Sequence, residues 1–223
     1  MSQRLPLFPL GLVLFPGVVL PLHVFEERYR LLISELLERP ESEREFGVIT
    51  IRQGREVGQD GVQALHEIGC TARLRQVEPY DDGRFDIVTT GASRFRLTEL
   101  AGDRPYLVGE VERLPDEVGD RDEGHLLGAA VRSAFLDYLL ALAEAGADGI
   151  EVPDLPADDL VLSYLVAATV LVDLDDRQAL LEEPDGVARL RSELRLLRRE
   201  VRLLNAFGAA PAPELARAPT SPN

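Results

Sequence analysis

The pattern of apolar and polar residues changes its period twice along the chain. It begins with an apolar run at residues 5–24 that four prolines interrupt, namely Pro6, Pro9, Pro16 and Pro21. A membrane-spanning helix must satisfy its own backbone hydrogen bonds, and each internal proline removes a donor and clashes with the preceding turn. The run therefore predicts no membrane span but two short buried strands, at 5–8 and 18–24, joined by a turn at 15–17. Prolines are tolerated at the starts and edges of strands.

The next segment, 25–39, predicts an amphipathic helix that ends before Pro40. Its apolar residues recur at the spacing of a helix and would form one buried stripe. This stripe consists of Phe25, Tyr29, Leu32, Ile33, Leu36 and Leu37.

Between residues 45 and 114 the period becomes two, which predicts strands. We expect strands at 46–52, 65–77, 85–89, 95–100 and 106–114, with turns at 80–83 and at Gly91. The strand at 65–77 has a mainly apolar face, made of His66, Ile68, Cys70, Ala72 and Leu74. Several short strands separated by turns are typical of an antiparallel barrel or sandwich.

An acidic stretch rich in helix breakers, at 115–124, predicts a boundary between a domain at 1–116 and a helical bundle at 117–207. Helices are expected at 125–145, 160–172, 175–181 and 186–207. Their caps would include Asp158, Asp159 and Asp185. The first of these helices should face inward through Leu126, Leu127, Ala130, Val131, Phe135, Tyr138, Leu139 and Leu142. The tail at 208–223 is rich in proline and alanine, which predicts disorder.

The last helix carries a seam with alternating spacings of three and four, made of Val187, Leu190, Leu194, Leu197, Val201 and Leu204. Arg191 and Arg198 fall beside the seam at e positions, and Glu193 and Glu200 fall at g positions, as in coiled coils that select a partner. Two interpretations follow. The seam packs inside its own bundle, or it forms a homodimer.

Composition excludes several functions. The net charge of −15 opposes non-specific binding to nucleic acid or to anionic lipid. All 24 basic residues are arginines, so the chain has no lysine for a Walker A phosphate loop, a Ser-Lys catalytic dyad or a Schiff base. The single cysteine rules out an internal disulfide, which agrees with a cytoplasmic location.

The sequence predicts no catalytic, metal or cofactor site. The three histidines, His23, His66 and His125, lack the spacing of metal ligands. Cys70 falls on the apolar face of a strand and is expected to be a packing residue. Ser34, Ser93 and Ser163 lack the nucleophile-elbow motif of hydrolases.

Four short motifs resemble the N-terminal, substrate-recognition domain of ATP-dependent Lon proteases. They are LPLFPLGLVLFPG at 5–17, LPLHVFEERYR at 20–30, IGCTARL at 68–74 and GASRFRL at 91–97. The chain looks still more like stand-alone bacterial proteins built from that domain alone, and its end after the last helix favours an independent module. The resemblance implies an α+β fold, with a PUA-like antiparallel pseudo-barrel followed by an α-helical bundle.

The resemblance also implies a non-catalytic module for protein quality control that binds polypeptide segments or unfolded protein. The candidate binding residues are Phe15, Glu26, Arg28, Tyr29 and Arg94. For the charged residues among them, the alternative is an internal ion pair that ties the helix to the barrel; for Phe15 it is burial. Two other functions remain open. One is an assembly protein that dimerises through the last helix. The other is a nucleic-acid binder, which rests on analogy of fold alone.

Overall fold

The computed structural model describes residues 2–54, 62–102, 104–147, 149–150 and 152–207. It forms two compact units, Met1–Pro115 and Asp116–Arg217, which we call the N-terminal unit and the C-terminal unit. The predicted disordered tail lies outside the described residues. The predicted fold class, an α+β fold in which a mainly antiparallel barrel precedes a set of helices, is confirmed.

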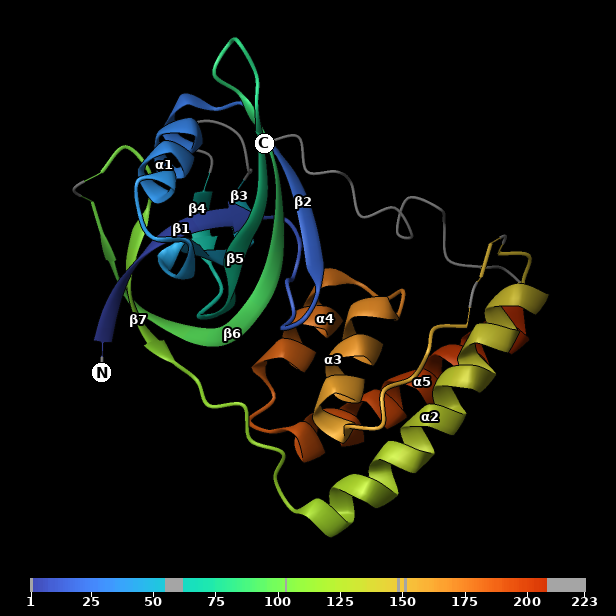
Figure 1. Cartoon of the computed structure of the whole chain (residues 1–223). Coiled ribbons are helices and arrows are strands. Elements are labelled where there is room, and N and C mark those ends of the chain that lie inside the picture. Colours follow the sequence, from blue (N-terminus) through green and yellow to red (C-terminus); the bar gives the residue numbers. More distant parts are fainter. Residues whose placement is uncertain (1, 55–61, 103, 148, 151, 208–223) are drawn as a thin grey trace. The chain divides into compact units, whose positions relative to one another are not determined.

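The N-terminal unit is a closed barrel (Figure 1). Its strands are β1 (Ser2–Leu10), β3 (Glu45–Gly54), β5 (Ile68–Pro79), β6 (Phe85–Ala101) and β7 (Val108–Arg113). The barrel closes because the first half of β1 pairs antiparallel with β7, while its second half pairs parallel with β3. Two shorter strands extend it: β2 (Val19–Val24) pairs with β6, and β4 (Val62–Leu65) pairs with β3.

The strand expected at 65–77 is two strands. β4 and β5 pair with the same strand, β3, and the chain bends between them at His66 and Glu67. At this bend the His66 amide donates to the Thr50 carbonyl, and the Glu67 carbonyl accepts from the Leu97 amide. The apolar face continues from His66 to Leu74 across this bend, so the alternation of side chains gave no sign of the break.

The turn expected at Gly91 is also wrong, since β6 runs through this residue without interruption. A Cβ on Gly91 would lie 2.1 Å from the carbonyl oxygen of Phe15. The glycine therefore allows the turn between β1 and β2 to approach the barrel wall, where the Gly17 amide donates to the Gly91 carbonyl at 2.9 Å.

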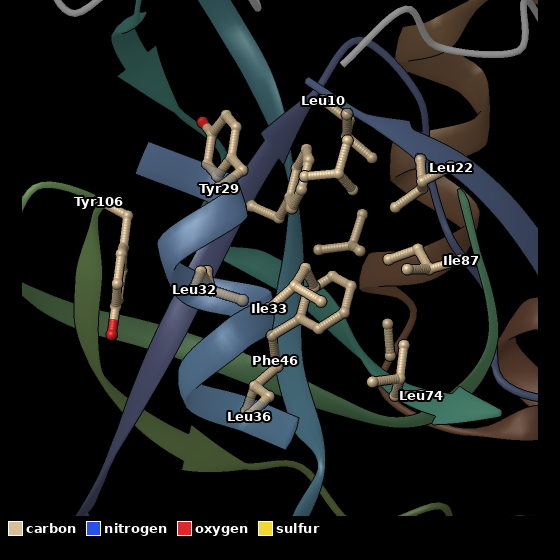
Figure 2. Packing of buried hydrophobic residues seen from close by; sticks show 14 of the residues in the cluster. Leu10, Leu22, Tyr29, Leu32, Ile33, Leu36, Phe46, Leu74, Ile87 and Tyr106 are labelled. Atoms are coloured by element: carbon tan, nitrogen blue, oxygen red, sulfur yellow. The ribbon is translucent and has the colours of Figure 1, made fainter. Parts of the chain in front are cut away.

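The main core of the N-terminal unit lies between α1 (Glu27–Leu37) and the barrel. Figure 2 shows α1 directing Leu32, Ile33 and Leu36 into this core, beside Phe46 of β3. The Tyr29 ring stacks on the Phe8 ring with centroids 4.0 Å apart. A second, smaller cluster consists of Leu5, Leu7, Ile49, Phe95 and Val111. A 3₁₀ turn, η1 (Glu41–Glu43), connects α1 to β3.

The C-terminal unit contains α2 (Arg121–Glu144), α3 (Asp159–Thr169), α4 (Leu174–Glu182) and α5 (Gly186–Phe207). Each begins at an aspartate whose carboxylate accepts a backbone N–H of the first turn, as predicted for Asp158 and Asp185. Asp159 is instead a paired residue, because it accepts from Arg132 at 3.0 Å. Leu126, expected inside, is 76% exposed.

The helix α5 packs against α2, α3 and α4 (Figure 1). Its seam residues Val187, Leu190, Leu197 and Leu204 are buried, while Leu194 and Val201 are half-buried. Glu193, expected beside the seam at a g position, is fully buried. The flank is covered because α5 contacts several helices, whereas a two-stranded coiled coil leaves g positions open to solvent.

The helix α2 is long and apolar enough, by length and composition, to cross a membrane. Core helices of soluble proteins meet the same criterion, and one face of α2 packs against α5.

Candidate functional site

Two of the five predicted binding residues are internal. Phe15 is 1% exposed and Arg94 is 2% exposed. The Arg94 guanidinium donates to the carbonyl of Pro115 at 3.3 Å, and its own carbonyl accepts from the Leu114 amide at 3.0 Å. Arg94 therefore ties β6 to the segment that follows β7, in a structural role.

The other three predicted residues come together at the start of α1. The Arg28 guanidinium forms an ion pair with Glu26 at 3.1 Å and lies 4.5 Å from the centre of the Tyr29 ring. Tyr29 is buried on Phe8, so the ring is a fixed base for the cation. The Arg28 guanidinium is thus positioned by Glu26 and by the Tyr29 ring. Arg28 also borders a surface pocket.

This pocket, which we call the α1 pocket, has a volume of about 410 Å³ and lies entirely in the N-terminal unit. One wall is the outer face of α1, where helical spacing brings side chains three and four residues apart together. The opposite wall comes from the hairpin between β5 and β6 and from the segment before β7. The lining residues are Glu27, Arg28, Arg30, Leu31, Ser34, Gly83, Phe85 and Pro105.

The α1 pocket combines apolar surface with cations. Leu31 is 39% exposed, Phe85 is half-buried and Pro105 is exposed, so the three offer apolar contact to a ligand. Arg28 and Arg30 stand beside them on α1. An apolar surface with a few polar groups that fix orientation is the usual composition of a binding site.

The Arg30 guanidinium lies beside Gly83 of the hairpin. A Cβ on Gly83 would lie 2.1 Å from Arg30 Nη2, so the glycine leaves room for the guanidinium. Across the described part of the chain, Arg30 has no side-chain hydrogen bond and no ion pair. Nearby, hydrogen bonds from the backbone and side chain of Arg84 lower the pKa of Asp82, and the charge of Arg30 adds to this effect.

A polar cluster fixes the hairpin next to the pocket. His23 Nδ1 lies 2.6 Å from Asp86 Oδ1, and the Tyr80 hydroxyl donates to Asp86 Oδ2 at 2.5 Å. The hydrogen bonds from Tyr80 and then His23 lower the pKa of Asp86. Because these contacts join β2 to the hairpin, they position Gly83 and Phe85 relative to α1.

Sequence reasoning did not find Arg30, Leu31, Phe85 or Pro105. One local signal was available, since Leu31 is an apolar residue that lies off the buried stripe of its helix. The rest of the pocket depends on tertiary contacts between distant segments. Cys70 is buried, as expected of a packing residue, and its thiol donates to the Thr71 carbonyl at 3.5 Å. Among the residues that the structure describes, no three His, Cys, Asp or Glu side chains are grouped to hold a metal ion.

The fold defines a β-barrel domain followed in the chain by a helical unit, and comparison with known proteins gives the family. The model of the ATP-dependent protease La (LON) substrate-binding domain matches residues 4–199. The chain therefore belongs to the LON substrate-binding domain family.

Several relatives and solved structures are similar to this chain. Lon protease 2 of Myxococcus xanthus is 30% identical over 91% of the chain, and Lon protease of Anaeromyxobacter dehalogenans is 30% identical over 90%. The chain spans about a quarter of their length, 24% of each. The Lon N-terminal domain protein from Xanthomonas campestris matches with a TM-score of 0.59 and 27% identity, covering 86% of this chain and 98% of that one.

A second solved structure supports the fold alone. The N-terminal domain of the Mycobacterium avium complex Lon protease matches with a TM-score of 0.61 and 18% identity. The match covers 88% of this chain and 98% of that one.

Proposed function

We propose that the N-terminal unit is a non-catalytic module that binds polypeptide segments, including segments of unfolded protein, in the α1 pocket. The family membership supports a substrate-binding role. The observation that carries the proposal is the pairing of exposed Leu31 with half-buried Phe85 across a pocket of about 410 Å³. A single apolar side chain of a peptide would pack between them.

The cations of the pocket would orient the bound segment. Arg30 has donors available, since its side chain forms no hydrogen bond or ion pair with the residues that the structure describes. It could donate to a peptide carbonyl or to a carboxylate near the buried apolar residue. Such contacts favour certain residues next to the bound apolar side chain but do not recognise a long sequence. Binding should therefore be weak and should tolerate many peptide sequences.

The test uses reduced and carboxymethylated α-lactalbumin, a permanently unfolded polypeptide, labelled for fluorescence anisotropy. Leu31→Glu should weaken its binding about tenfold, because it places a charge in the apolar part of the pocket. Leu100→Glu is the matched control: Leu100 is 49% exposed in the same unit but lies outside the pocket. Equal binding by the two variants would refute the α1 pocket as the site.

Homodimerisation through α5 is the alternative for this chain. The burial of Val187, Leu190 and Leu197 within the C-terminal unit supports packing inside the bundle instead. Replacing Leu197 by Arg would then unfold the unit rather than convert a dimer to a folded monomer, which sedimentation and circular dichroism distinguish. The proposed function involves no nucleic-acid or membrane partner, in line with the net charge of −15. The proposed place of action is the cytoplasm.

A further inference from the structure

The C-terminal unit has its own groove, between α2 and α5, with a volume of about 510 Å³. Glu123 pairs with Arg191 near the start of both helices, and the groove opens further along both, so the two helices run in the same direction. The residues that line it are Ala130, Ser133, Ala134 and Asp137 of α2 and Arg198, Val201 and Arg202 of α5. Because most of the α2 wall is alanine and serine, another helix could approach its backbone closely.

An exposed seam runs along α2 through this groove. Its residues recur with spacings of four and three, which places them on one face: Leu126, Ala130, Ser133, Asp137 and Leu140. Leu126 is 76% exposed and Leu140 is 63% exposed, one toward each end of the helix. Large apolar side chains toward both ends, with Ala130, Ser133 and the acidic Asp137 between them, leave room for the apolar face of an amphipathic helix.

The α5 wall is cationic. Four exposed arginines, spaced by four, three and four residues, share one face of the helix: Arg191, Arg195, Arg198 and Arg202. Arg191 pairs with Glu123, and Arg195 donates to Ser192. Arg198 and Arg202 have no ion pair and no side-chain hydrogen bond to any described residue.

This stripe contrasts with the rest of the molecule. The sequence of α5 contains six arginines and two glutamates, whereas the whole chain has a net charge of −15. One of those two glutamates, Glu193, is fully buried and does not screen the exposed face. In the groove itself, Arg198 and Arg202 outnumber Asp137, the one carboxylate of the lining, so the groove attracts an acidic partner and repels a basic one.

We propose that the groove between α2 and α5 docks an acidic amphipathic helix of a partner protein. Apolar side chains at helical spacing would contact Leu126 and Leu140 and enter the small-residue wall near Ala134. Acidic side chains on the flank of the same helix would face Arg198 and Arg202. The site lies in the other unit from the α1 pocket, so the inference does not depend on the proposed function.

The probe is a pair of synthetic helical peptides with the same leucine seam, one with glutamate and one with lysine at every flanking position. Binding to the full chain is measured by fluorescence anisotropy at low and at high salt. The glutamate peptide should bind at least tenfold more tightly than the lysine peptide, and its affinity should fall with added salt.

Two variants test the two walls. Arg198→Glu combined with Arg202→Glu should weaken binding of the glutamate peptide about tenfold and strengthen binding of the lysine peptide. The reversed charge of the groove repels glutamate and attracts lysine. Ala134→Leu should weaken both peptides by filling the groove without changing charge. Arg52→Glu combined with Arg96→Glu is the control, since these exposed arginines lie on the barrel. Circular dichroism verifies that each variant is folded.

Several results would overturn the proposal. These are no binding of the glutamate peptide, equal binding of the two peptides, or no response to the Arg198 and Arg202 replacements. Tighter binding of single-stranded RNA than of the glutamate peptide would assign the stripe to nucleic acid. A self-associated chain that Ala134→Leu converts to a folded monomer would assign the groove to a second copy.

Discussion

The guanidinium of Arg30 occupies the space where any side chain on Gly83 would begin: a Cβ there would lie 2.1 Å from Arg30 Nη2. Gly83 also has a φ of 81°, which L residues adopt at a cost. Gly83→Ala should therefore have two separable effects. The backbone strain should lower the free energy of unfolding by about 1 kcal/mol, and the displaced Arg30 should weaken peptide binding in the α1 pocket.

Urea unfolding and anisotropy measure these two effects separately. In an Arg30→Ala background, Gly83→Ala should keep its cost in stability but lose its additional effect on binding. Gly102→Ala serves as the control, because a Cβ on Gly102 would meet no atom within 4 Å. Unchanged peptide binding by Gly83→Ala would argue against Arg30 as a ligand contact.

Glu193 should make the C-terminal unit less stable as pH rises. Burial raises the pKa of its carboxyl well above the ordinary value of 4.5; the charge of Arg189 opposes this and that of Glu183 adds to it. The folded state therefore holds a proton that the unfolded state releases from about pH 4.5 upward. The contribution of this group to the free energy of unfolding is full below pH 4.5 and is lost as pH rises through the folded-state pKa.

Glu193→Gln removes that titration while keeping the shape of the side chain. The two proteins should have similar stability near pH 4.5, and the variant should become the more stable one at higher pH, by about 1.4 kcal/mol for each pH unit within the window. Urea unfolding followed by circular dichroism across this range gives both curves. Parallel curves would show that Glu193 does not titrate differently on folding.

The sequence predicted the elements well where one local pattern was sufficient. The period of three and four on α5, together with Asp185 at its start, gave the helix its observed bounds. The burial of Glu193 was not predicted, because it depends on how many helices surround α5, which no local pattern encodes. The turn predicted at Gly91 was wrong because this glycine has another purpose. Its small size allows the Phe15 carbonyl to approach the strand.

The candidate site was less predictable than the fold. Barrel closure requires β1 to pair in parallel with β3, and the α1 pocket requires α1, a hairpin and the segment before β7 to meet. Phe15 and Arg94 stand in recognisable motifs, but the structure uses them internally. A residue within a recognisable motif can therefore serve the packing of the barrel rather than ligand binding, as Phe15 and Arg94 do.

Arg94 should therefore matter for stability and not for binding. Arg94→Met removes a charge-assisted hydrogen bond to the Pro115 carbonyl while filling much of the same buried volume. We expect the free energy of unfolding of the N-terminal unit to fall by about 2 kcal/mol. Under conditions in which the variant is folded, anisotropy with the unfolded polypeptide should give an unchanged affinity. A selective loss of affinity would restore Arg94 as a ligand contact.

Two glycines one helical turn apart in α2 should respond in opposite ways to the same substitution. A Cβ on Gly124 would find its nearest atom at 3.6 Å, an ordinary contact, whereas a Cβ on Gly128 would lie 2.1 Å from Asp159 Oδ1. Gly124→Ala should raise the free energy of unfolding by about 0.5 to 1 kcal/mol, because alanine has the higher helix propensity.

Gly128→Ala has the same gain in helix propensity. However, the new methyl group must displace the Asp159 carboxylate, which pairs with Arg132 at 3.0 Å. Arg132 also donates to the Pro156 carbonyl at 2.7 Å, so the displacement disturbs the segment that leads into α3. We expect a net loss of about 1 kcal/mol or more. In an Asp159→Ala background the carboxylate is gone, and the nearest remaining atom is Arg132 Nη1 at 3.1 Å, the end of a flexible side chain. Gly128→Ala should then stabilise the protein as Gly124→Ala does. If Gly128→Ala destabilised both backgrounds equally, Asp159 would not be the residue that requires glycine at this position.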